Sequence, residues 1–308
     1  MALVTLAAAK GSPGVTTMAL VMGALWPRQV LVAECDAAGA DIPLRMSSED
    51  GGVIDPDRGL LSLAAAGRKG LQPQLVLDHT QRVLGGTEVL AGARVPEQAA
   101  GMTNIWPMLG PALDGIPGYD VLADAGRIGV GTPQTALLRS SRLLILVATA
   151  EPSSVVHTRE RLNVLAAMLD PASPVGTPIA VAVIADPKAR DAVAQVRETL
   201  QRTEVPLHGV WHIAHDPKGA GFFKGRIVGR ADKTLLVRTA REVTRDVAAL
   251  VEPFFEPLPE AAVPASMEEG EWGDFSFGPD GEVTARQQPT GPPGQWGAPS
   301  APSPGSRP

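Results

Sequence analysis

The first residues that could do chemistry lie in a glycine-containing segment close to the N-terminus, which we call the glycine loop. It follows an apolar run, Leu3–Ala8, and precedes a second apolar stretch with helical spacing. A strand, a glycine turn and a helix N-terminus bring backbone N–H groups together, and the helix dipole favours an anion, so such a loop can bind phosphate. It departs from the common pattern G-x-x-x-x-G-K-[ST], because Ala9 replaces the first glycine and Val15 replaces the lysine. The loop comprises Ala9, Lys10, Gly11, Ser12, Pro13, Gly14, Val15, Thr16 and Thr17.

Two aspartates follow later apolar runs and could complete a metal site with the glycine loop. Asp36 comes after Val30–Glu34, and Asp124 comes after Tyr119–Ala123. If these runs are parallel strands, both carboxylates lie at the same sheet edge as the loop, near the Thr16 hydroxyl. A hydroxyl and two carboxylates are the hard oxygen ligands that suit Mg²⁺ bound to phosphates. A single aspartate after a strand is more often a helix N-cap, but three matching positions in order favour a metal site formed by Thr16, Asp36 and Asp124.

The elements that must position these residues alternate between strands and helices over residues 1–252. The expected strands are short, β-branched and apolar on both faces, which is typical of a parallel sheet covered by helices on each side. They are Leu3–Ala8, Val30–Glu34, Thr87–Ala91, Tyr119–Ala123, Leu143–Ala148, Ile179–Ala185 and Gly209–Ile213. The expected helices are Thr16–Leu25, Leu60–Arg68, Pro96–Leu113, Thr132–Arg139, Ser153–Leu169, Ala189–Arg202 and Asp232–Val251. The alternation predicts a doubly wound α/β fold with a mostly parallel sheet and helices on both faces, which binds ligands beyond the carboxyl ends of the strands.

The composition changes near Pro253, and residues 253–308 form an acidic tail rich in proline and glycine. The tail holds eight acidic residues against two arginines, which accounts for the whole formal net charge of −6. It has no periodic apolar pattern, so we expect it to be disordered. Aromatic residues lie among its acids at residues 271–277, a pattern that fits either a docking motif for a protein partner or a solubilising tail without one.

Cysteine usage and hydropathy exclude several classes of protein. Cys35 is the single cysteine, so no intramolecular disulfide and no cysteine-based metal cluster can form. No run reaches the roughly 20 apolar residues that a membrane span requires. We therefore expect a cytoplasmic protein without a membrane span.

These motifs together resemble those of the ParA/MinD family of P-loop ATPases, over about residues 2–250. The glycine loop is similar to their deviant Walker A loop, K-G-G-x-G-K-T-[TS], with Lys10 at the place of the signature lysine. Glu34-Cys35-Asp36 resembles their D-x-D element, and Asp120 to Asp124 resembles their Walker B strand. Among family members, the chain is most similar to MinD-like proteins of actinobacteria. The resemblance implies catalytic roles for Lys10 and Asp36, Mg²⁺ near Thr16, Asp36 and Asp124, and ATP bound by Lys10, Gly11, Ser12, Pro13, Gly14, Val15, Thr16 and Thr17.

The chain also departs from the family pattern at residues that matter for catalysis. Val15 removes the lysine that grips the terminal phosphates, and Pro13 stiffens the loop. Residues 185–187 read Ala-Asp-Pro, where the family has a purine-contacting asparagine. Losing one cation from a desolvated phosphate site costs about 2–5 kcal/mol, by analogy with a broken buried ion pair. Lys10 and Arg127 are the candidates to replace its charge.

Three functions remain open from the sequence. The first is an ATP-dependent homodimeric switch that positions a cargo, such as a chromosome, a septum component, or a secretion or pilus apparatus. The second is a pseudo-ATPase scaffold, which Val15 favours. The third is a regulator that holds nonspecific DNA on basic residues near the end of the domain, although a helix surface laced with ion pairs explains the same residues. These residues are Lys224, Arg226, Arg230, Lys233, Arg238, Arg241 and Arg245.

Overall fold

A computed structural model describes residues 1–129, 131–225 and 230–252, together with residues 276–277 and 283–284. The chain divides into two units, Met1–Ser266 and Met267–Pro308. In the second unit, β9 (Ser276–Phe277) pairs antiparallel with β10 (Val283–Thr284). The predicted disorder of residues 253–308 and the predicted docking segment fall otherwise outside the described residues.

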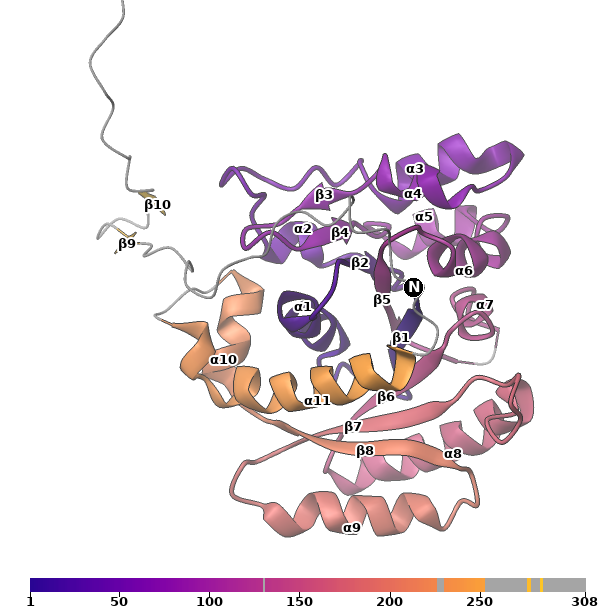
Figure 1. The fold of residues 1–308 in the computed structure, drawn as a ribbon, viewed down its shortest axis with the longest axis vertical. Helices are drawn as coiled ribbons and strands as arrows, with labels where there is room; N and C mark the ends of the chain where they lie inside the picture. The colour runs from indigo at the N-terminus through magenta and orange to yellow at the C-terminus, as the bar shows by residue number, and fades with distance from the viewer. Residues whose placement is uncertain (130, 226–229, 253–275, 278–282, 285–308) are drawn as a thin grey trace, which may run out of the picture. The chain divides into compact units, whose positions relative to one another are not determined.

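An eight-stranded sheet forms the centre of the first unit, in the order β3-β4-β2-β5-β1-β6-β7-β8. Every neighbouring pair is parallel except the edge pair β3 and β4, which is antiparallel. The strands are β1 (Leu3–Ala8), β2 (Val30–Glu34), β3 (Gln81–Arg82), β4 (Glu88–Leu90), β5 (Asp120–Arg127), β6 (Leu143–Thr149), β7 (Ile179–Ala185) and β8 (Leu207–Ala214). The predicted doubly wound, mostly parallel sheet is confirmed, and β1 lies between β5 and β6 in its middle (Figure 1).

Helices cover both faces of this sheet, and alternate residues of β1 contact each side. Val4 and Leu6 belong to a core cluster with α1 and α11, whereas Leu3 belongs to a cluster with α3 and α6, and Ala7 to one with α8 and α9. The helices are α1 (Val15–Leu25), α2 (Ile42–Arg45), α3 (Leu60–Ala66), α4 (Pro73–Leu77), α5 (Pro96–Gly101), α6 (Trp106–Asp114), α7 (Thr135–Leu138), α8 (Pro152–Leu169), α9 (Arg190–Gln201), α10 (Pro217–Gly221) and α11 (Leu235–Val251). Short 3₁₀ turns are η1 (Gly67–Lys69), η2 (Phe222–Lys224) and η3 (Ala231–Lys233).

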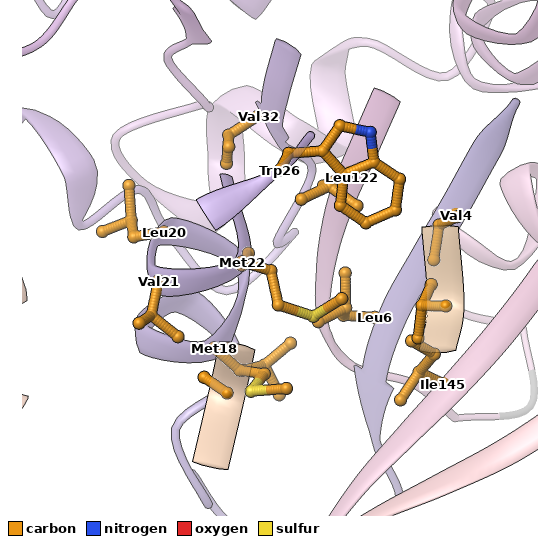
Figure 2. Close-up of a cluster of buried hydrophobic side chains, with 14 of the residues drawn as sticks. Val4, Leu6, Met18, Leu20, Val21, Met22, Trp26, Val32, Leu122 and Ile145 are labelled. Atoms are coloured by element: carbon orange, nitrogen blue, oxygen red, sulfur yellow. The ribbon is translucent and has the colours of Figure 1, made fainter. Parts of the chain in front are cut away.

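The helix that follows β1 is buried on nearly all sides. It packs against β5 and β2 on the sheet and contacts α11 on its other side, which explains why its sequence is apolar all round. Figure 2 shows Met18 and Met22 of α1 among Leu6 and Ile145 of the sheet. A side chain at Gly23 would lie 2.6 Å from Val32, so the helix approaches β2 as closely as glycine permits. This packing fixes the N-terminus of α1 at the end of β1.

Several sequence-based boundaries were wrong for local reasons. The predicted helix Pro96–Leu113 is interrupted, and α6 begins afresh at Trp106 with Pro107 in its first turn, where proline's missing N–H costs nothing. The spacing of apolar residues in Asp232–Val251 predicts a packed face formed by Leu235, Leu236, Val243, Val247 and Leu250. Three of these, Leu236, Val243 and Val247, are buried in α11, whereas Leu235 and Leu250 are 43% and 40% exposed.

Candidate functional site

The glycine loop leaves the carboxyl end of β1 and turns into α1 through two glycines with left-handed backbone. Gly11 has φ 73° and Gly14 has φ 108°. Gly14 caps α1, and within the described part of the chain no side-chain cap hydrogen bond is made to the first turn. A side chain at Gly11 would meet nothing within 4 Å, and Lys10, Gly11 and Ser12 are exposed. The loop therefore presents free backbone donors at a helix N-terminus, where an anion is favoured.

Val15 adds no positive charge to the glycine loop. Its side chain is 5% exposed and lies in the core cluster that holds Met18 and Ile42. The residue at the lysine position thus packs into the protein interior. A bound phosphate would need its positive charge from elsewhere in the site.

Asp124 is the most deeply buried acid of the site. The sequence placed it just beyond its strand, but β5 continues to Arg127, because the chain bulges at Ala125 and Gly126 and Arg127 then pairs with Ala8 of β1. Its Oδ1 accepts the Gly126 N–H at 2.9 Å, and Oδ2 has no hydrogen-bond partner among the described residues. Burial raises the pKa of Asp124 to about 6, against the lowering effects of the Thr16 hydroxyl and the Gly126 N–H. A buried carboxylate oxygen without a donor is the atom that a metal ion would satisfy.

Asp36 follows β2 and lies beside the stretch of β5 that carries Asp124. The Cys35 N–H donates to the Asp124 carbonyl at 2.7 Å, which ties the chain after β2 to β5. A Cβ on Gly126, whose φ is +56°, would lie 2.0 Å from the Asp36 carboxyl carbon. Burial raises the pKa of Asp36, whereas the Ala38 N–H and the charge of Arg127 lower it. Thr16 and Asp36 therefore both lie close to the Asp124 segment.

Lys10 is held away from these acids. Its Nζ lies 3.0 Å from Nε2 of His157 on α8, and His157 Nδ1 lies 3.4 Å from Glu160 Oε2. The predicted catalytic lysine is thus anchored within the chain, against a helix that follows β6.

Glu34 is a site residue whose role sequence reasoning missed. It is 1% exposed, and Oε1 accepts the N–H groups of Asp41 at 2.6 Å and Ile42 at 2.9 Å, while Oε2 accepts that of Gly92 at 3.1 Å. These bonds fix the segment that carries Asp36. Burial nevertheless raises the pKa of Glu34 to about 7. The signal available in the sequence was its place as the first acid of Glu34-Cys35-Asp36.

The raised pKa of Glu34 predicts that folding stability depends on pH. Its folded-state pKa of about 7 lies above the ordinary 4.5, so the native state binds the proton more tightly than the unfolded chain. The contribution of Glu34 to the free energy of unfolding is complete below the unfolded-state pKa. It is lost as the pH rises through about 7, by on the order of 3 kcal/mol. We expect urea denaturation without nucleotide to give a free energy of unfolding that falls across this range. Glu34→Gln should reduce the slope, and an unchanged slope in that variant would contradict the assignment.

Other candidate chemistry in the described residues is weaker. Cys35 is buried, and burial raises the pKa of its thiol, so a reactive thiolate is disfavoured. The described basic residues from Lys224 to Arg245 are exposed, and Arg230 pairs with Asp232 at 3.1 Å, while Arg226 falls outside the described residues. No described helix is long and apolar enough to cross a membrane.

Solved structures of known proteins share this architecture. MinD of Pyrococcus horikoshii OT3, solved with Mg-ADP, is 17% identical and matches with a TM-score of 0.60 over 83% of this chain and 99% of its own. The cell division ATPase MinD of Pyrococcus furiosus is 18% identical, with a TM-score of 0.59 over 81% and 99%. The chain has the fold of the MinD and ParA ATPases. A ParA family ATPase of Chlorobium tepidum also matches this MinD/ParA fold, at 14% identity and a TM-score of 0.59 over 79% and 97%. No protein-family model and no curated protein sequence matches the chain.

The residues of the site can hold a magnesium ion, but the loop lacks the lysine that would contact phosphate at position 15. Thr16, Asp36 and Asp124 offer a hydroxyl and two carboxylates, and Asp124 Oδ2 has no partner among the described residues. The glycine loop offers backbone donors to phosphate. The lysine position contributes only an apolar side chain.

Proposed function

We propose that the protein binds a purine nucleoside di- or triphosphate with Mg²⁺ at the glycine loop and acts as a ParA/MinD-type switch. The observation that carries the proposal is the buried carboxylate of Asp124, which lies beside the Thr16 hydroxyl and whose Oδ2 has no geometric hydrogen bond among the described residues. The MinD/ParA fold supports it, and the MinD of Pyrococcus horikoshii was solved with Mg-ADP. The proposed outcome of binding is a nucleotide-dependent homodimer that positions a cellular cargo.

Each residue of the site has a distinct part in this proposal. The backbone N–H groups of the glycine loop and the first turn of α1 would bind the phosphates. Thr16 and Asp124 would hold Mg²⁺, which would neutralise negative charge on the phosphates. Asp36, fixed against Gly126, would orient water near the terminal phosphate, and Lys10 would reach the phosphates of a partner subunit. Hydrolysis of ATP is expected to be slow, since Val15 supplies no charge.

A pseudo-ATPase scaffold is the second candidate, and the burial of Val15 favours it. In that case the fold is kept, nucleotide binds weakly or not at all, and association does not respond to ATP. Binding measurements separate the two functions.

The close contact between Gly126 and the Asp36 carboxylate allows a test of whether Asp36 belongs to the nucleotide site. Gly126→Ala places a Cβ 2.0 Å from the Asp36 carboxyl carbon, so Asp36 must move. Gly86→Ala has the same kind of backbone strain, at φ +84°, but nothing lies within 4 Å of its Cβ. Both variants should lose about 1–2 kcal/mol of stability from the left-handed backbone.

Calorimetric titration with ADP, ATP and GTP in the presence of Mg²⁺ is the measurement. We expect the wild type and Gly86→Ala to bind alike, and Gly126→Ala to bind at least about tenfold more weakly, which is about 1.4 kcal/mol. Wild-type protein that binds none of the nucleotides would overturn the proposed function and favour the scaffold. Equal binding by both variants would remove Asp36 from the site.

A further inference from the structure

The strand β5 bulges just after Asp124. Asp124 pairs with Leu6 of β1. The next pair joins Arg127 to Ala8, so β5 holds one more residue than β1 between the two pairs. Gly126 lies in this bulge with φ +56°, a left-handed conformation that glycine adopts without strain. Bulges of this kind change the direction in which nearby side chains point.

Gly126 contacts both acids of the proposed site. Its N–H donates to Asp124 Oδ1 at 2.9 Å, which leaves Oδ2 as the oxygen without a partner among the described residues. A Cβ on Gly126 would lie 2.0 Å from the Asp36 carboxyl carbon. The position of Gly126 therefore determines how the two carboxylates lie relative to each other.

Gln134 holds the backbone on both sides of Gly126. The residue is 1% exposed, and its Nε2 donates to the Ala125 carbonyl at 3.2 Å and to the Arg127 carbonyl at 3.0 Å. These two carbonyls fix the orientation of the amide, because the amide oxygen in the same place would face two acceptors. Oε1 is buried and has no hydrogen-bond partner within the described part of the chain. A buried acceptor without a donor costs stability, which points to a role for the two donors on Nε2.

The backbone of Gln134 is fixed independently of β5. Gln134 directly precedes α7, and the Leu137 N–H donates to the Gln134 carbonyl at 3.1 Å. Leu137 and Leu138 are fully buried, and α7 packs against α6. Because this short helix is packed into the domain, its preceding side chain can hold the bulge of β5 in place.

We propose that Gln134 is a positioning residue of the magnesium site: it holds the bulge of β5 and, through Gly126, keeps Asp124 in place for Mg²⁺ with Asp36 beside it. The inference rests on the proposed nucleotide binding and names the residue that orders the acids of that site. Gln134 acts through the backbone and does not itself contact the metal. Hydrogen bonds that orient the ligands of a metal ion typically contribute about 10–100-fold to metal affinity.

The test is the affinity for ADP, measured by calorimetric titration with Mg²⁺ and again with a chelator. The ratio of the two affinities is called the Mg²⁺ gain, and we expect it to be at least about tenfold in the wild type. Gln134→Met keeps the length of the side chain and removes both donors. It should lose most of the Mg²⁺ gain and bind ADP in chelator like the wild type. A residue that only stabilised the fold would leave the Mg²⁺ gain of the folded protein unchanged.

Gln81→Met is the matched control. Gln81, on the edge strand β3, also donates from Nε2 to two backbone carbonyls, those of Asp55 at 2.8 Å and Arg58 at 2.7 Å. The control therefore loses the same kind of bridge. We expect it to keep the full Mg²⁺ gain, because its bridge holds residues 55–58 and not the bulge of β5.

Gly126→Ala provides an independent arm, because Gln134 is proposed to act through Gly126. If both changes disturb the same bulge, their effects overlap. Gly126→Ala should then weaken ADP binding with Mg²⁺ by a smaller factor in the Gln134→Met background than in the wild type. Equal factors in the two backgrounds would contradict the action of Gln134 through Gly126.

The outcomes separate this inference from the proposed function. Wild-type protein that binds no ADP overturns the proposed function itself, and wild-type binding without a Mg²⁺ gain overturns the magnesium site and the role of Gln134 with it. A wild-type Mg²⁺ gain that Gln134→Met retains in full overturns only the role of Gln134. If Gln134→Met does not fold, Gln134→Asn replaces it, because its amide is one methylene shorter and cannot bridge both carbonyls. The full Mg²⁺ gain in a folded Gln134→Asn protein would then overturn the inference, and a reduced gain would support it.

Discussion

Replacement of Lys10 by alanine is expected to abolish nucleotide-dependent dimerisation and leave the monomer folded. A two-fold interface uses the same patch of both chains, so one lysine reaching across it would complete both nucleotide sites. Lys10 is exposed and contacts His157, so its removal takes little from the core. Light scattering with and without ATP and Mg²⁺ should give a dimer for the wild type with nucleotide, and a monomer for Lys10→Ala in both conditions.

The contact between Lys10 and His157 provides the control for that experiment. His157→Ala removes the group that holds Lys10 at 3.0 Å in the monomer, without removing the lysine. We expect this variant to dimerise with ATP at least as readily as the wild type. A tight dimer that ignores both nucleotide and Lys10→Ala would contradict the switch and favour the scaffold.

The second large effect is expected from Val15→Lys. A lysine at this position restores a donor to the terminal phosphates, and the missing contact is worth about 2–5 kcal/mol by analogy with a buried charge pair. Some of this gain is lost because Val15 is buried, and its removal takes apolar packing from the core. We expect ATP to bind at least about tenfold more tightly and to be hydrolysed faster, as measured by calorimetry and phosphate release.

Ser12→Lys is the matched control for this gain. Ser12 lies in the same loop but is exposed, so the variant adds an equal charge without the geometry of the lysine position. Its effect on ATP affinity should be small, because an exposed charge is screened by water and salt. A Val15→Lys protein that is folded but binds ATP no better than Ser12→Lys would mean that the loop is closed or reshaped around Pro13.

The sequence predicted the long elements of the fold well and the short ones poorly. The bounds of β1 and β7 match the apolar runs Leu3–Ala8 and Ile179–Ala185, because a strand buried on both faces is apolar throughout. The two-residue strand β3 and the four-residue helix α2 carry too few residues for a periodic signal. The strand β3 exists because it pairs with β4 a few residues later, and α2 begins where Glu34 accepts the N–H groups of Asp41 and Ile42.

The same distinction applies to the site. Thr16, Asp36 and Asp124 were predicted because each lies next to a recognisable strand or loop. Glu34 accepts a hydrogen bond from Gly92, which lies 58 residues later, and Lys10 contacts His157, which lies 147 residues later. Contacts between residues so far apart depend on how the strands are ordered in the folded sheet, which local sequence patterns do not predict.

The affinity for ADP with and without Mg²⁺, compared between the wild type and Asp124→Asn, tests whether Asp124 holds Mg²⁺ beside a bound nucleotide. Asparagine keeps an oxygen to accept the Gly126 N–H, but it removes the charged oxygen that has no partner among the described residues. We expect Mg²⁺ to tighten ADP binding to the wild type at least about tenfold, and Asp124→Asn to bind ADP with no dependence on Mg²⁺. A wild-type affinity that does not respond to Mg²⁺, or an Asp124→Asn protein with the full Mg²⁺ effect, would contradict this role of Asp124.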